Sequence, residues 1–202
     1  MSSLRIVLFA VAGLAFAGLA AVTAMSMIDA PRNQDALFSE PVAGIGGPFQ
    51  LVDQNGRAVT EADFSDKPKV IYFGFTFCPD VCPTTLFELT NWLDKLGPDG
   101  DKIQALFITV DPERDTADKL ANYLGAFDKR ILGLTGTQAE IEKVAADFRI
   151  YHKKVPLEDG DYTMDHTASI LLFKADGTFF GTIAYGENED NAVAKLKRLA
   201  ES

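Results

Sequence analysis

The two cysteines of this 202-residue chain, Cys78 and Cys82, lie within one six-residue stretch, CPDVCP. The stretch begins three positions after the end of the apolar run 70–75, VIYFGF, which has the length and composition of a strand that is buried on both faces. The fold must therefore present both thiols at one end of a central strand. A thiol pair in this position is typical of proteins that bind a soft metal ion there or that cycle a disulfide.

Strand and helix patterns alternate along the chain after position 48. The residue patterns predict strands at 49–52, 58–59, 70–75, 103–110, 131–134, 168–173 and 178–185, and helices at 83–96, 116–126, 138–148 and after Asn188. Thr137 and Glu140 have the spacing of a capping box at the start of the third helix. This order predicts an α/β domain with a central mixed sheet flanked by helices. With a cysteine pair leaving the first core strand, it matches the thioredoxin-like fold.

The N-terminal segment 1–28 is predicted to be a transmembrane anchor. No charged residue occurs between Ile6 and Ile28, a run of 23 residues, which suffices to cross a bilayer core of roughly 30 Å. Arg5 then favours a cytoplasmic N-terminus. We expect a bacterial inner-membrane protein with a single span and its domain facing the periplasm. The alternative is a soluble periplasmic protein released by signal cleavage near the small residues 22–24.

The remaining sequence divides into a linker and one domain. Residues 29–47 contain two prolines and three glycines among polar residues and indicate a linker, and residues 48–202 form the predicted domain. Residues 1–30 carry one Arg and one Asp, so the formal charge of −10 belongs to the rest of the chain. Such an acidic surface argues against nucleic acid and anionic lipid as partners.

The local sequence around the cysteines indicates how the thiols are activated. Proline suits the first turn of a helix, so we expect the helix to begin at Pro83 with Cys82 at its N-terminal cap. The positive end of the helix dipole would then favour a thiolate at Cys82. Three residues separate the cysteines, whereas the thioredoxin-type redox motif has two. A redox-active Cys78–Cys82 disulfide remains feasible with this spacing.

A metal site would need a third ligand, because two thiolates under-coordinate most ions. His166 enters the predicted strand 168–173 through a polar stretch that we interpret as a loop beside the cysteines. His152 precedes two lysines, and we interpret it as a solvated loop residue. Two thiolates and one imidazole suit Cu(I), and with an added oxygen they also hold Cu(II). Asp80 and Asp165 are adjacent in sequence to these ligands and are candidates to orient them through hydrogen bonds.

Three separated motifs resemble the Sco/SenC family of copper proteins. They are YFGFTFCPDVCP at 72–83, VDPERDT at 110–116 and DHT at 165–167. The similarity extends from about Gly47 to the end of the chain and includes the anchor. It implies that Cys78, Cys82 and His166 bind one copper ion in an exported, thioredoxin-like domain. It also implies a role in metallating the dinuclear CuA centre of cytochrome c oxidase subunit II.

The sequence leaves the type of activity open. We expect a copper metallochaperone, not an enzyme, that serves oxidase subunit II and exchanges with other periplasmic copper chaperones or thioredoxin-like reductants. The alternative is a membrane-tethered thiol–disulfide reductase that keeps the oxidase CuA cysteines reduced. A thioredoxin-fold peroxidase using Thr76 and Arg114, and a static disulfide, are further alternatives.

Overall fold

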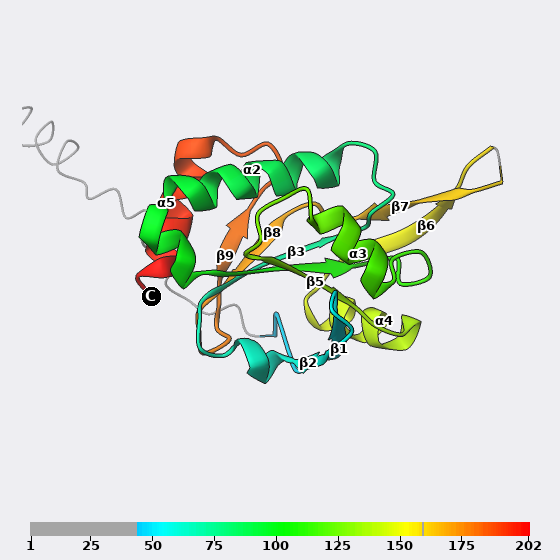
Figure 1. Cartoon of the computed structure of the whole chain (residues 1–202), viewed down its shortest axis with the longest axis horizontal. Coiled ribbons are helices and arrows are strands. Elements are labelled where there is room, and N and C mark those ends of the chain that lie inside the picture. The colour runs from blue at the N-terminus through cyan, green and yellow to red at the C-terminus, as the bar shows by residue number, and fades with distance from the viewer. Residues whose placement is uncertain (1–43, 159) are drawn as a thin grey trace, which may run out of the picture. The chain divides into compact units, whose positions relative to one another are not determined.

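The computed structural model describes residues 44–158 and 160–202 (Figure 1). Within these two ranges no helix combines the length and the apolar character needed to cross a membrane. The predicted anchor at 1–28 and most of the predicted linker at 29–47 lie outside the described residues. The two ranges thus correspond to the predicted domain and the last residues of the linker.

The described residues form a seven-stranded mixed sheet, as the alternating patterns predicted. Its three central strands are parallel, and the outer strands join them antiparallel. In spatial order the strands are β2 (Ala58–Thr60), β1 (Gln50–Asp53), β5 (Ile131–Thr135), β4 (Gln104–Thr109), β3 (Lys69–Gly74), β8 (Ile170–Phe173) and β9 (Phe179–Ile183). Strand β3, which leads to the cysteines, is buried along its whole length.

Helices cover both faces of the sheet. They are α2 (Val81–Lys95), α3 (Ala117–Leu124), α4 (Gln138–Asp147) and α5 (Glu189–Ala200), with short 3₁₀ turns at Glu61–Phe64 and Gly97–Lys102. Neighbouring strand residues point to opposite faces. The Tyr72 ring contacts Phe107, which contacts Tyr123 of α3. The Phe73 ring contacts Phe148 at the end of α4. Helices α2 and α5 therefore share one side with α3, and α4 covers the other (Figure 1).

Two helix starts test the capping predictions. At α4, Thr137 and Glu140 form the predicted capping box. At α2, however, the prediction of a start at Pro83 was wrong, because the helix begins at Val81 with Asp80 at the cap. Proline is tolerated as the third helical residue because the N–H groups of the first turn have no partner within the helix. Cys82 consequently lies inside the first turn.

A separate two-stranded ribbon, β6 (His152–Pro156) and β7 (Tyr162–His166), projects beyond the main sheet (Figure 1). The prediction that His152 and His166 lie in loops was therefore wrong. The two histidines are directly paired across the ribbon. Thr167 donates its backbone N–H to the carbonyl of Tyr151, which makes this a non-hydrogen-bonded pair, the kind in which side chains lie closest.

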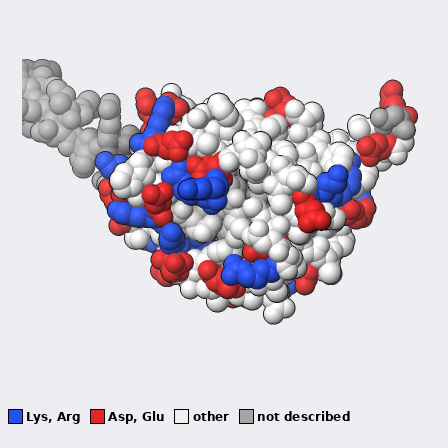
Figure 2. Space-filling model, in the orientation of Figure 1, with Lys and Arg blue, Asp and Glu red and all other residues white. Residues whose placement is uncertain are grey.

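Charged side chains are unevenly spread over the face shown in Figure 2. Lysine, arginine and acidic groups gather together near α5, and the middle of this face is largely uncharged. Acidic and basic groups thus lie side by side on this face. Intermixed signs do not form the continuous basic surface that nucleic-acid binding requires.

Two adjacent residues of α2 test the assignment of its buried face. Leu86 is fully buried and Phe87 is 61% exposed. Replacing Leu86 with Ala should lower the free energy of unfolding by about 2–5 kcal/mol, because a cavity remains in the core. Replacing Phe87 with Ala should change it by no more than about 0.5 kcal/mol. Urea denaturation measures both; equal losses would contradict the orientation of α2.

Candidate metal centre

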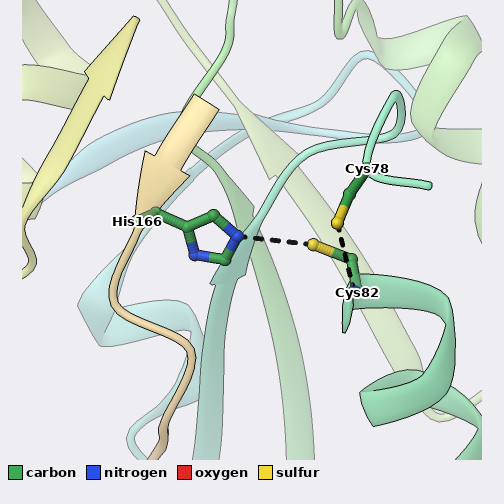
Figure 3. Close-up of side chains that lie close together, drawn as sticks. All are labelled: Cys78, Cys82 and His166. Atoms are coloured by element: carbon green, nitrogen blue, oxygen red, sulfur yellow. Dashed lines mark hydrogen bonds between the residues drawn. The ribbon is translucent and has the colours of Figure 1, made fainter. Parts of the chain in front are cut away.

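Three chain segments bring two sulfurs and one imidazole together. Cys78 lies in the loop after β3, Cys82 in the first turn of α2, and His166 is the last residue of β7 (Figure 3). Their ligand atoms all lie within 4.8 Å of one another. Nε2 of His166 is 3.5 Å from Sγ of Cys82. The three predicted ligands therefore meet at one point, in a geometry that could hold a metal ion; that they bind one remains a prediction.

The start of α2 can approach β3 closely because β3 ends in glycine. A Cβ atom added at Gly74 would lie 3.0 Å from Sγ of Cys82 and 2.8 Å from the Phe107 ring. Real Cβ atoms do not occupy such short distances in a packed interior. Gly74 thus makes room for the Cys82 sulfur against the sheet, where Cys82 is fully buried.

The two thiols have opposite electrostatic environments. The Cys82 thiol donates to Cys78, and this bond, with support from the N–H groups of Cys82 and Asp80, lowers the pKa of Cys78 against the opposing effect of burial. The same bond and burial raise the pKa of Cys82. The N–H of Cys82 lies 3.3 Å from Sγ of Cys78. The prediction of a thiolate at Cys82 was wrong, because the helix N-terminus points its N–H groups at the preceding cysteine.

The orientation of His166 leaves one ring nitrogen for a metal. Nδ1 lies 2.9 Å from the backbone oxygen of Thr167. A carbonyl only accepts hydrogen bonds, so Nδ1 carries the proton and Nε2 presents its lone pair toward Cys82. Edge contacts with the rings of Phe75 and Tyr72 fix the orientation of the imidazole ring. A histidine fixed in this tautomer is prepared to coordinate through Nε2.

The ribbon that carries His166 is held by the loop after β4. Nε of Arg114 donates to the buried carboxylate of Asp111 at 2.5 Å, and Nη1 donates to the carbonyl of Tyr162 at 2.8 Å. The Tyr162 hydroxyl donates to the same carboxylate at 2.8 Å. The guanidinium also lies over the rings of Tyr162 and Phe77. Arg114 thereby joins the start of β7 to the residue before Cys78.

Asp115 also holds the start of the cysteine loop. Its carboxylate, which is fully buried, accepts from the N–H and hydroxyl of Thr76 and from the hydroxyl of Thr109. Burial raises the pKa of Asp115. Thr76 and Arg114 are the residues considered for a peroxidase pocket. Both instead form hydrogen bonds to aspartates of the loop after β4.

The remaining candidate residues lie around the site without entering it. The exposed Asp80 accepts a hydrogen bond from Thr84 at 3.4 Å. Asp165 is paired with Lys153 across the ribbon, and as the neighbour of His166 it points to the opposite face. His152 shares the face of His166, although it is not in the group of three ligand atoms within 4.8 Å. No contact of either carboxylate with a ligand side chain supports their predicted orienting role.

Comparisons with known proteins agree on one family. Residues 39–201 match the SCO1/SenC family model. The copper-bound ScoI structure of Bradyrhizobium japonicum is 54% identical, covering 77% of this chain and 99% of that one with a TM-score of 0.72. The Arabidopsis thaliana mitochondrial SCO1 homolog 1 is 40% identical over 166 residues, 80% of this chain and 49% of that protein. The chain therefore spans about half the length of that curated relative.

A more distant relative of known structure bears on redox chemistry. BsSco is 25% identical, with a TM-score of 0.63, over 80% of this chain and 96% of that one. A disulfide switch has been identified in BsSco, which is a member of the Sco family of cytochrome c oxidase assembly proteins.

The Arg114 contacts predict a loss of order in the ribbon when the guanidinium is removed. Arg114→Met leaves the buried Asp111 carboxylate without its ionic partner and should lower the free energy of unfolding by about 2–3 kcal/mol. Backbone amides of β7 should exchange faster with deuterium. The control is Lys143→Met, which removes an exposed ion pair with Asp147 and should cost at most about 1 kcal/mol. Unchanged exchange in β7 would contradict the anchoring role.

The lowered pKa of Cys78 predicts selective alkylation at acidic pH. In Cys82→Ser, a hydroxyl replaces the donating thiol and the backbone N–H groups are retained. Iodoacetamide should therefore modify Cys78 at pH values where an ordinary thiol, with a pKa of about 8.5, is protonated. In Cys78→Ser, the buried Cys82 should react slowly and only at higher pH. Mass spectrometry across a pH series gives both rates; equal midpoints would contradict the assignment.

Proposed function

The chain belongs to the SCO1/SenC family, and on that premise we propose that it is a copper metallochaperone for the CuA centre of cytochrome c oxidase. Copper is its cargo, and Cys78, Cys82 and His166 are the ligands. The convergence of these three ligand atoms within 4.8 Å carries the proposal. The copper in the Bradyrhizobium relative and the membership of BsSco among oxidase assembly proteins support it.

The donor set fits copper better than other common ions. Two thiolates and one imidazole are soft, and three donors satisfy Cu(I). Structural zinc sites normally have four protein ligands, and the group found among the described residues has three. Calcium and magnesium prefer oxygen ligands, which this set lacks.

The protein side chains prepare the site in distinct ways. Cys78 is the first thiolate, because the Cys82 thiol and the N–H groups at the start of α2 stabilise its charge. Cys82 releases its proton to solvent when the ion arrives, since its thiol is neutral beforehand. His166 contributes a lone pair without losing a proton. Cys78 is only half-buried, so thiols of an acceptor protein can reach its side of the site and displace ligands one at a time.

The acceptor and the location follow from the family premise and the sequence. We assign oxidase subunit II as acceptor, with other periplasmic copper chaperones or thioredoxin-like reductants as further partners. The segment 1–28 anchors the domain in the bacterial inner membrane facing the periplasm, and signal cleavage there would release it.

A thiol–disulfide reductase is the second candidate, supported by the half-buried, thiolate-prone Cys78 above a buried Cys82. In that reaction the Cys78 thiolate attacks the disulfide of the target and releases one target thiolate. Cys82 then attacks Cys78, forming the Cys78–Cys82 disulfide and releasing the second target thiol. A periplasmic thioredoxin-like dithiol must supply two electrons to restore the pair.

Copper titration of four variants tests the ligand set. Replacing Cys78, Cys82 or His166 with Ala should in each case weaken Cu(I) binding by more than roughly 10–100-fold. That range is the loss typical of removing a residue that only hydrogen-bonds to a ligand. His152→Ala is the matched control, because it removes the cross-strand imidazole and should leave one ion bound per chain with the wild-type affinity. Full affinity in His166→Ala would contradict the proposed site.

Two measurements on the wild-type chain, copper affinity and disulfide reduction potential, distinguish the two candidate functions. Binding should weaken as pH falls, because protons compete for the sulfurs. The disulfide reduction potential of the metal-free chain is measured in parallel. Weak Cu(I) binding together with a strongly reducing potential would favour the reductase over the chaperone.

A further inference from the structure

Tyr72 carries a buried polar group that the proposed site has not yet used. The residue lies in β3 and is fully buried. Its hydroxyl oxygen is among the buried side-chain atoms without a hydrogen-bond partner in the described part of the chain. Leaving a buried hydroxyl unpaired is costly, so its retention in the core calls for a partner that appears in another state of the protein.

The position of Tyr72 identifies that partner. Tyr72 and Gly74 lie on the same face of β3, and the Gly74 position faces Sγ of Cys82. The Tyr72 ring also lies edge-on to the His166 ring, with centroids 6.2 Å apart. The hydroxyl therefore belongs to the buried wall of the metal centre, behind the Cys82 sulfur.

Beside the backbone N–H of Phe75, the neighbouring groups leave Tyr72 as the side-chain donor for this sulfur. Thr85 is also buried on the first turns of α2, but its hydroxyl donates to the carbonyl of Val81 at 2.8 Å. A tyrosine hydroxyl has an ordinary pKa of about 10, so it is protonated at neutral pH and can donate. A neutral thiol is a weak acceptor, whereas a thiolate is a strong one.

We propose that the Tyr72 hydroxyl donates a hydrogen bond to the Cys82 sulfur when that sulfur binds copper as a thiolate. This inference rests on the proposed function, and it makes Tyr72 a positioning residue that acts through Cys82. The hydrogen bond adds to the backbone N–H of Phe75 in stabilising negative charge on this sulfur, and so favours displacement of the Cys82 proton by copper. Hydrogen bonds to metal-bound sulfur also tune the electronic properties of the centre.

Tyr123 offers a matched control. Its hydroxyl is likewise buried without a hydrogen-bond partner among the described residues. The Tyr123 ring packs on Phe107, which in turn packs on Tyr72, so this hydroxyl is one ring further along the same apolar layer. Tyr123→Phe and Tyr72→Phe thus remove the same atom from the same core, and only the second change removes the proposed donor.

The test compares the two variants and the wild type as full chains, using copper alone as the probe. Tyr72→Phe should bind Cu(I) about tenfold more weakly in competition with a chelator. Its sulfur-to-Cu(II) charge-transfer band should move to longer wavelength, because an unbonded thiolate gives up its electrons more easily. Tyr123→Phe should match the wild type in both measurements.

Thermal unfolding of the metal-free proteins separates this role from a structural one. Without copper the Tyr72 hydroxyl faces a neutral Cys82 thiol, which is a weak acceptor, so metal-free Tyr72→Phe should be about as stable as the wild type. Wild-type affinity with an unshifted band in Tyr72→Phe would overturn the inference and leave the proposed function intact. A wild-type chain that fails to bind copper through the cysteines would overturn both.

Discussion

The carboxylate of Asp111 is the contact on which the geometry of the site depends. It is buried at the end of β4 and accepts hydrogen bonds from both Arg114 and Tyr162. Tyr162 begins β7 and His166 ends it, so this carboxylate fixes the strand that carries the imidazole. Without this carboxylate, fewer contacts would hold the ribbon against the cysteine loop, because among the described strands β6 and β7 pair only with each other.

The three ligand side chains are supported with unequal rigidity. Cys82 is buried at the start of a fifteen-residue helix and lies against a glycine of the central sheet. His166 belongs to a ribbon outside that sheet, and Cys78 lies in a loop and is only partly buried. A protein that must bind an ion and later release it benefits from this arrangement. One ligand belongs to the packed core, while the other two come from segments outside the central sheet.

Much of the fold could be predicted from residue patterns because the signals are local. The apolar run at 70–75 became β3, and the capping pair Thr137 and Glu140 does begin α4. The ribbon was missed because His152–Pro156 has little apolar character, and its contacts come from Arg114 and Glu113, about 40 residues earlier. The sequence also did not predict that Cys78 is the thiol with the lower pKa. It depends on where α2 begins, and a shift of two residues redirects the N–H groups from one sulfur to the other.

The central claim is that the two sulfurs and the His166 imidazole hold one copper ion together, and X-ray absorption spectroscopy of the copper-loaded chain tests it most directly. The account predicts two sulfur neighbours and one imidazole nitrogen in the wild type, with the imidazole signal lost in His166→Ala and retained in His152→Ala. Fewer than two sulfur neighbours, or an imidazole signal that survives in His166→Ala, would contradict it.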